Sequence, residues 1–137
     1  FIMIINGKEF ELKLHGETFH CALDVTMNFI GGKWKSVIIW YLRKDVKRFG
    51  ELKKLVPDIT EKMLSLTLRQ LEADGLVERS VFAEVPPRVE YKLSAQGKSL
   101  LPLVEEMASW GRRKVKEEGE MREVNRKKNV KKKTVSA

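Results

Sequence analysis

The segment of residues 49–75 constrains the fold most strongly, because it places two helical patterns on either side of a tight turn. Apolar residues three or four apart predict a short helix over residues 49–56, which Pro57-Asp58 ends. Thr60 is a favourable cap for a longer helix, and Gly75 stands where a helix C-terminus favours a left-handed residue. One face of the longer helix is predicted to be buried, and its apolar residues are Leu64, Leu68 and Leu71.

Two stretches that alternate with a period of two residues follow directly, "LVERSVFAE" and "RVEYKLS". Val77, Val81 and Ala83 share one face of the first stretch, and the matching residues of the second are Val89, Tyr91 and Leu93. Val85-Pro86-Pro87 joins the stretches, so they are predicted to form a hairpin with a stiff tip. Short helix, turn, capped helix and hairpin is the order of a winged helix-turn-helix, and we expect an α+β fold that is mainly α.

The N-terminal residues 1–20 are predicted to form an extra β-hairpin. Asn6-Gly7 readily adopts a type I′ turn, and apolar residues alternate with charged ones after it, so we expect one face of this hairpin to be buried. A helix is predicted over residues 22–30 and another over residues 33–42, with Gly31-Gly32 interrupting them.

A last helix is predicted over residues 95–118, with Pro102 as a kink or restart near its beginning. Residues 119–137 lose all periodicity and carry seven Lys or Arg against two Glu, so they are predicted to be a disordered basic tail with a net charge of +5. A solubilising extension and an arm that strengthens non-specific DNA binding are both open interpretations. The central domain is then expected over residues 21–118.

The composition agrees with one soluble domain and a polyanionic partner. The chain has 137 residues, of which 42% are hydrophobic, and this is enough for one core. The formal net charge of +8 favours nucleic acid first and an acidic membrane surface second. A single cysteine excludes an internal disulfide framework, and no stretch approaches the roughly 18 apolar residues of a membrane span. We therefore expect a cytoplasmic protein that does not enter the membrane.

The stretch "IGGKW" raises the question of a phosphate-binding loop, because two glycines and a lysine precede an apolar helix. A P-loop needs a glycine five positions before Gly32 and a Ser or Thr after the lysine, and this chain has Met27 and Trp34 there. The glycines are instead predicted to let one helix end and turn closely into the next, with Trp34 packed inside as an anchor.

The winged arrangement assigns a role to the side chains outside the predicted core. A helix fits the major groove of DNA, the preceding helix braces it, and a hairpin tip reaches an adjacent groove, where Arg88 suits a narrow minor groove. For Lys62 and Arg69 an ion pair with Glu61 or Glu72 is the alternative, and Arg48 can equally be a rim charge. The predicted DNA-binding residues are Arg48, Thr60, Lys62, Ser65, Leu66, Arg69 and Arg88.

Over about residues 21–111 the chain resembles the HxlR-type regulators, a branch of winged-helix bacterial transcription factors akin to MarR. The resemblance rests on "LDVTMNFIGGKWKSVIIWYL", "RFGELKKLVPDITEKMLSLTLRQLEADGLVERS" and "VPPRVEYKLSAQGKSLLPLVEEMASWG" in the family's order and spacing. The pattern "LEADGLVER" occurs in winged helices generally, whereas "IGGKW" together with "PPRVEY" is specific. The N-terminal hairpin has no counterpart in the family pattern.

The resemblance implies a sequence-specific regulator of transcription that binds double-stranded DNA, acting as a homodimeric repressor on a pseudopalindromic operator. It also implies that the first helices and the last long helix are dimerisation helices. Trp40, Met107 and Trp110 are expected at that interface, because a further apolar face on a soluble helix usually meets a partner subunit. Completion of the monomer's own core is the alternative for these three residues.

Cys21 lies ten residues before Gly31, where several members of the family carry a cysteine that senses oxidants or electrophiles. The resemblance therefore makes Cys21 a candidate redox sensor for an effector of unknown identity. Here Cys21-Ala22-Leu23 replaces the family's Cys-Pro-Val, and a buried, inert thiol is the alternative. His15, His20 and Cys21 are too few for a metal site, so neither a metal nor a cofactor is expected.

Two other classes of function fit the sequence less well. A winged-helix module that binds protein without specific DNA binding would present an acidic or apolar recognition face, and only Leu66 fits that description. An enzyme would need several titratable groups that converge on one site, and the sequence predicts no catalytic residue.

Overall fold

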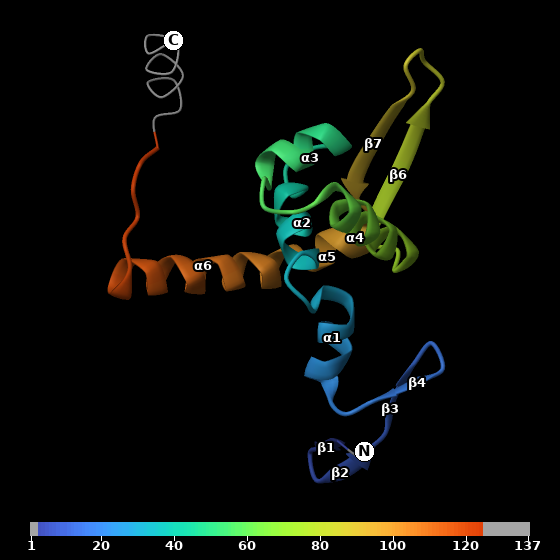
Figure 1. The fold of residues 1–137 in the computed structure, drawn as a ribbon. Coiled ribbons are helices and arrows are strands. Elements are labelled where there is room, and N and C mark those ends of the chain that lie inside the picture. Colours follow the sequence, from blue (N-terminus) through green and yellow to red (C-terminus); the bar gives the residue numbers. More distant parts are fainter. Residues whose placement is uncertain (1–2, 125–137) are drawn as a thin grey trace. The chain divides into compact units, whose positions relative to one another are not determined.

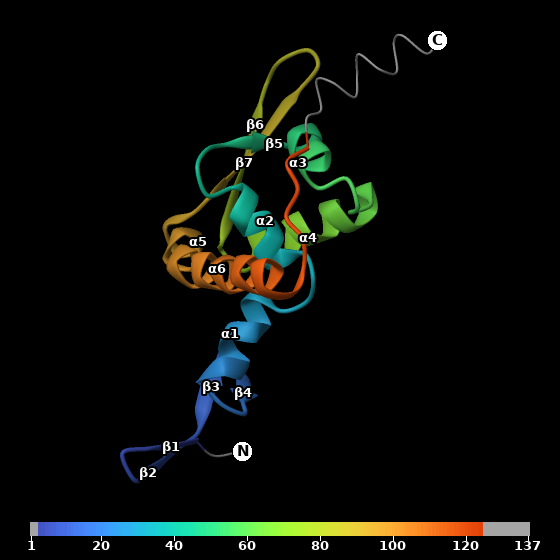
Figure 2. The ribbon, with the colours of Figure 1, turned by 90° about the vertical axis from the view of Figure 1, so that its left-hand side faces the viewer.

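The computed structural model describes residues 3–124 and divides the chain into two compact units, Phe1–Glu105 and Glu106–Ala137. The first unit is mainly helical with short antiparallel sheets, which confirms the predicted fold class (Figures 1 and 2). The last helix, α6 (Leu101–Glu118), begins in the first unit and supplies the helical part of the second. The elements before it are β1 (Met3–Ile5), β2 (Lys8–Phe10), β3 (Leu12–Leu14), β4 (Glu17–Phe19), α1 (Ala22–Ile30), α2 (Lys35–Tyr41), β5 (Lys47–Arg48), α3 (Phe49–Leu55), α4 (Glu61–Ala73), β6 (Val77–Phe82), β7 (Arg88–Leu93) and α5 (Ala95–Ser99).

The N-terminal segment forms two hairpins where the sequence predicted one. The expected turn at Asn6-Gly7 is present, with φ of 51° and 76°, and joins β1 to β2. A second turn of the same kind at His15-Gly16 joins β3 to β4. The face expected to be buried is found only in part: Phe10 is 43% exposed, Leu12 and Leu14 are half-buried, and Phe19, opposite Leu12 in register, is buried. Two-stranded hairpins of three-residue strands are too small to bury a face of their own.

Gly31 and Gly32 make the junction between α1 and α2 for two different reasons. The Gly31 amide donates a hydrogen bond of 2.7 Å to the Met27 carbonyl oxygen, and a Cβ on Gly31 would collide with that oxygen. Gly32 has a φ of +81°, which L side chains rarely adopt. The junction therefore needs both glycines for its backbone path, as predicted, and Trp34 is partly buried against the core beside it.

The core of the first unit forms around α4. The predicted inner face of α4 is confirmed, because Leu64, Leu68 and Leu71 are at most 1% exposed. Full burial of one such side chain contributes about 1.5–3 kcal/mol, so this row of leucines fixes the rotation of α4 about its own axis. The same cluster includes Ile38, Ile39, Leu42, Leu52, Val56, Ile59, Leu76, Val77, Tyr91, Leu93 and Val104.

The predicted hairpin is the β6–β7 pair, and β5 adds a third strand in the order β5-β7-β6. Gly75, with a φ of +74°, ends the α4 segment and turns the chain into β6. The base of the hairpin is buried at Val77 and Leu93, whereas Val81 in its outer half is exposed. The hairpin extends away from α4 in Figure 1, and its outer half consequently has no helix to cover it.

The predicted last helix is split, as expected near Pro102. Helix α5 begins at the cap residue Ser94, whose side chain accepts a hydrogen bond from the Gly97 amide, and α6 follows from Leu101 with Pro102 in its first turn. Residues 119–124 have no regular structure, and residues 125–137 of the predicted basic tail lie outside the described part of the chain. None of the helices within residues 3–124 is long and apolar enough to cross a membrane.

The junction generates a stability prediction. We expect Gly31→Ala to lower the free energy of unfolding by about 1–3 kcal/mol through the collision with Met27, and Gly32→Ala by about 1–2 kcal/mol through its positive φ. Gly50→Ala in α3 is the control, because nothing lies within 4 Å of a Cβ there and alanine favours a helix. Urea denaturation measures all three variants. Equal stabilities for the Gly31 and Gly50 variants would contradict this account.

Candidate nucleic-acid interface

Helices α3 and α4 and the turn between them form a rigid pair. The backbone amide of Arg48 donates a 3.0 Å hydrogen bond to Glu51, which closes the start of α3. Val56 and Ile59 are buried within the turn, and the Thr60 hydroxyl accepts a 3.0 Å hydrogen bond from the Met63 amide at the start of α4. These hydrogen bonds cap the N-terminal ends of both helices, and the buried turn holds α4 at one angle to α3.

The outer face of α4 carries four of the predicted DNA-binding residues. Lys62, Leu66 and Arg69 are exposed, and Ser65 is half-buried. This face lies opposite the leucine row, so it is available while the core remains packed. A helix with such a face has the width that the major groove of DNA accepts.

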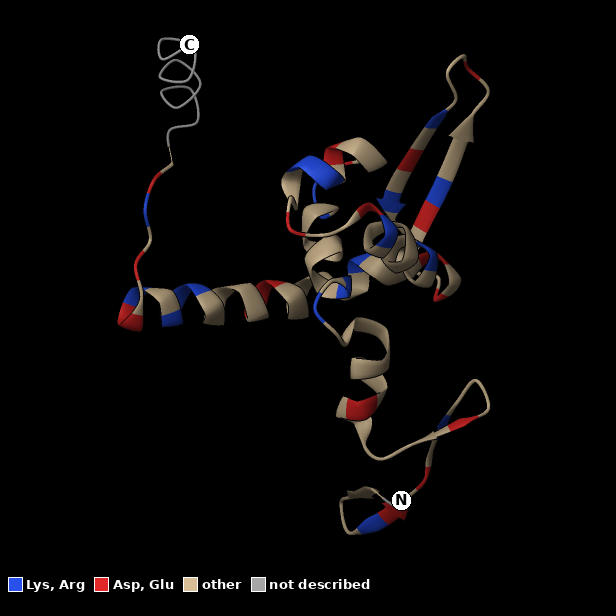
Figure 3. Ribbon diagram, viewed as in Figure 1, with Lys and Arg blue, Asp and Glu red and all other residues tan. Residues whose placement is uncertain are grey.

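The cationic groups of this region are mostly free of internal partners. Within residues 3–124, no carboxylate lies within 4.0 Å of the charged nitrogens of Arg48, Lys62, Arg69 or Arg79. The expected alternative for Lys62 and Arg69, an ion pair with Glu61 or Glu72, is therefore not found. Figure 3 shows Lys and Arg on α3, α4, β6 and β7, interspersed with Asp and Glu.

Arg88 is engaged inside the hairpin. It stands at the start of β7, and its guanidinium lies 3.3 Å from a Glu84 oxygen, 3.2 Å from a Glu90 oxygen and 4.3 Å above the Phe82 ring. Its Nε is shielded from solvent, and the alignment with Glu90 is that of an ion pair without a hydrogen bond. Contact between Arg88 and DNA, as predicted from the sequence, would require it to exchange these partners.

The tip of the hairpin, residues 83–87, carries no basic side chain. Residues 83–87 carry the acidic side chain of Glu84 together with Val85, which is fully exposed, and two prolines. The Val85-Pro86 peptide bond is cis. Arg88 lies below this tip, at the register position opposite Phe82.

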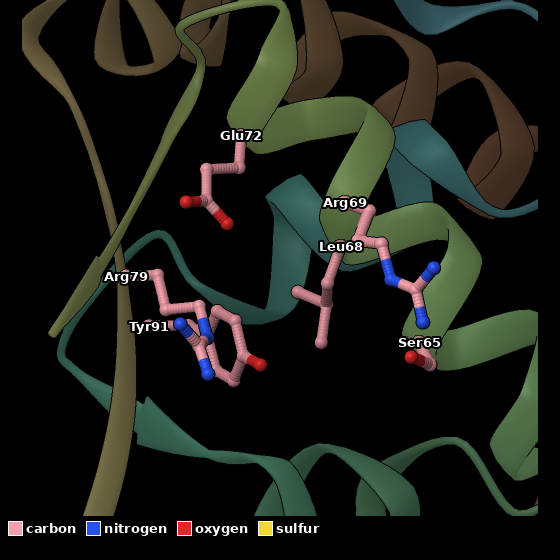
Figure 4. A pocket seen from close by; sticks show the side chains of 6 residues that line it. All are labelled: Ser65, Leu68, Arg69, Glu72, Arg79 and Tyr91. Atoms are coloured by element: carbon pink, nitrogen blue, oxygen red, sulfur yellow. The ribbon is translucent and has the colours of Figure 1, made fainter. Parts of the chain in front are cut away.

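A pocket of about 310 Å³ lies between α4 and the hairpin, and sequence reasoning did not anticipate it. Figure 4 shows Arg79 and Tyr91 on one side of it, and Leu68, Arg69 and Ser65 on the other. We call it the α4–β6 pocket, and its lining residues are Ser65, Leu68, Arg69, Glu72, Arg79 and Tyr91.

Arg79 is the residue of this pocket that the sequence could have pointed out. It stands between Val77 and Val81 on the face of β6 that alternation predicts to be the inner one, and it pairs in register with the buried Tyr91. A charged residue at an inward position of an otherwise alternating strand is the signal that was missed.

The predicted sensor and dimer residues fall outside this interface. Cys21 is half-buried at the N-cap position of α1. Trp40 is partly buried against the core and stacks under the Arg43 guanidinium at 3.7 Å, which matches the core alternative for this residue. Met107 and Trp110 on α6 are 46% and 60% exposed. Within residues 3–124, no group of three or more His, Cys, Asp or Glu is arranged to hold a metal ion.

A braced recognition helix followed by a β-hairpin defines the winged helix-turn-helix class of DNA-binding proteins. The profile of the HxlR-like helix-turn-helix family matches residues 29–119. The chain therefore belongs to the HxlR-like helix-turn-helix family of transcriptional regulators, which confirms the resemblance.

Relatives and solved structures agree with this family. The chain is 48% identical over 93 residues to the uncharacterized HTH-type transcriptional regulator YkvN of Bacillus subtilis (strain 168), covering 68% of this chain and 79% of YkvN. The oxidised form of the redox regulator HypR is similar with a TM-score of 0.66 and 42% identity, over 76% of this chain and all of HypR. The diamide-treated form of YodB from B. subtilis has a TM-score of 0.58 and 32% identity, over 74% of this chain and 97% of YodB.

The contacts of Arg88 generate a prediction about the hairpin. We expect Arg88→Ala to speed amide hydrogen exchange in β6 and β7 by about fivefold to thirtyfold, because it removes about 1–2 kcal/mol of charge-assisted contacts with Glu84 and Glu90. Lys92→Ala is the matched control, since its pair with Glu78 is exposed at both ends and should contribute little. Unchanged exchange in the Arg88 variant would mean that other contacts hold the hairpin.

Proposed function

We propose that this transcriptional regulator binds a specific, pseudopalindromic DNA site as a homodimer and represses transcription there. The observation that carries the proposal is the outer face of α4, which is exposed opposite a fully buried leucine row and holds cations without internal partners. A polyanion supplies the missing partners, and a groove supplies the shape.

The exposed residues divide by chemistry into phosphate contacts and base contacts. We assign phosphate contacts to Arg48 and Lys62, and also to Thr60, whose hydroxyl hydrogen remains available while its oxygen caps α4. Ser65 and Leu66 lie where α4 would approach base edges, and the Leu66 methyl groups suit a thymine methyl. Arg69 stands at the border between these two sets.

The homodimer is supported by the exposed apolar side chains of α6. Met107 and Trp110 follow one another at helical spacing, and large exposed apolar residues on a soluble helix usually meet a partner. Leu23 and Met27 are exposed on α1 in the same manner. A two-fold dimer would present two copies of α4 to half-sites about 34–36 Å apart. The cytoplasmic location and the boundaries at residues 20 and 118 remain predictions.

A winged-helix module that binds only protein is the alternative. It would leave the unpaired cations of α3 and α4 without a partner, whereas the exposed apolar side chains of Leu55, Met63 and Leu66 favour it. An enzymatic role has no support from the relatives, which are named as transcriptional regulators.

In vitro selection of binding sites, followed by mobility-shift titration at physiological salt, tests the proposal. We expect a preferred site bound by two chains, and Leu66→Ala should weaken binding to that site by about fivefold to tenfold while binding to random DNA stays unchanged. Lys98→Ala, an exposed change on α5, is the control. If the selected fragments bind no better than random competitor, the specific-binding proposal is wrong.

Response to oxidants through Cys21 is a second candidate property. It is favoured by the similarity to a redox regulator and to a protein studied after diamide treatment, and by the position of Cys21 at the start of α1. Because the sequence has one cysteine, a disulfide must join two copies of the chain or join Cys21 to a small thiol.

Diamide treatment tests this property. Two Cys21 thiols would lose two electrons and two protons to one diamide, which becomes the hydrazine, and a disulfide-linked dimer would form. We expect the linked protein to differ by at least about tenfold from the reduced protein in its affinity for the selected site. Cys21→Ser should show neither the link on a non-reducing gel nor the change in affinity. An unlinked wild-type protein with unchanged affinity would identify an inert thiol.

A further inference from the structure

The α4–β6 pocket brings together two guanidinium groups from two different elements. Arg69 comes from α4 and Arg79 from β6, and Figure 4 shows them on opposite sides of the hollow. Within residues 3–124 neither has a carboxylate within 4.0 Å, although Glu72 lines the same pocket. Arg88, in the same hairpin, has two such partners. The guanidinium groups of Arg69 and Arg79 are thus available to a ligand, whereas that of Arg88 is already paired.

Hydroxyl groups complete the set of donors. Ser65 and Tyr91 line the pocket, and neither hydroxyl has a hydrogen-bond partner among the described residues. The aliphatic wall is Leu68, which is 1% exposed, and Tyr91 is held as part of the core cluster. Packing therefore fixes the Tyr91 side chain and the Leu68 wall, whereas Arg69 and Arg79 are exposed and reach the pocket from its rim.

The charge of the lining selects the type of anion. Two guanidinium groups against one carboxylate leave a net charge of +1, which matches a group with a single negative charge. A phosphodiester has one negative charge and two free oxygens for guanidinium and hydroxyl donors.

We propose that the α4–β6 pocket binds one phosphate group, with Arg79 as its anchor and Arg69 as its second donor. The proposal rests on the proposed function for its main source of phosphate, because a helix in the major groove has backbone phosphates along both sides. Free phosphate in solution is the other source, and it would compete with DNA for the same donors.

Replacement of single backbone phosphates by neutral methylphosphonates tests the DNA source. At one position in each half-site we expect wild-type protein to lose about tenfold in affinity, and Arg79→Gln to lose less than about twofold, because its contact is already absent. Arg112→Gln on α6 is the matched control and should behave like wild type. Arg79→Lys keeps the charge and should recover only part of the effect, since one ammonium cannot bind two oxygens as a guanidinium does.

A DNA-independent measurement separates failure of the pocket from failure of the proposed function. Arginine Nε–H signals are followed by NMR while inorganic phosphate replaces chloride at constant ionic strength, with Arg79→Gln for assignment. Saturable shifts of the Arg69 and Arg79 signals would support the pocket and identify free phosphate as a source. If Arg79→Gln removes the effect of a methylphosphonate but free phosphate does not shift these signals, the pocket binds phosphate of the DNA backbone alone.

Different results would overturn the phosphate pocket and the proposed function. In one outcome, the protein binds its site specifically while a methylphosphonate affects wild type and Arg79→Gln equally and free phosphate shifts no arginine signal. That result would overturn the phosphate pocket and leave the proposed function intact. If no DNA is bound, the proposed function fails, and the NMR measurement alone decides the pocket: saturable shifts support it and their absence overturns it. The fold of Arg79→Gln is checked by thermal unfolding, and no loss is expected because Arg79 is exposed.

Discussion

Burial of the leucine row on α4 is the constraint on which the rest of the structure depends. Leu64, Leu68 and Leu71 pack into one cluster with Ile38 and Ile39 of α2, and rotation of α4 would return this apolar area to water. The outer face of α4 is therefore fixed before any ligand arrives. A recognition helix that is already oriented loses less conformational entropy on binding than one that must first be ordered.

The hairpin provides a second fixed direction, and its arginines illustrate how neighbours decide a role. Arg88 near the tip is held by two carboxylates and an aromatic ring, so it stabilises the hairpin. Arg79 near the base has no such partner among the described residues and faces α4 across a pocket. The same side chain thus has a structural task at one position and is free for a ligand at the other. From distance to the tip alone, Arg88 would have been expected to be the arginine that is free for a ligand.

Much of the fold follows from short-range patterns. The bounds of α1 and α3, the cap at Thr60 and the left-handed Gly75 depend on spacing and backbone conformation within a few residues, and these were predicted correctly. The burial of the N-terminal hairpin was predicted wrongly at Phe10, which is exposed, because alternation indicates which face is apolar and does not say whether anything covers it. Similarly, Trp40 was predicted to lie at the dimer interface, yet its side chain is partly buried against the core of its own chain.

The sequence by itself determined the class of the protein: a helix-turn-helix with a hairpin, a family with specific motifs, and a basic chain suited to nucleic acid. Only the tertiary structure decided which cations are free and which are paired. An ion pair such as Lys35 with Asp74 forms when side chains far apart in the sequence converge in the folded chain, and the α4–β6 pocket exists because a helix and a strand, joined by a turn, meet at an angle. Such convergence depends on the packing of whole elements, which residue spacing along one element cannot specify.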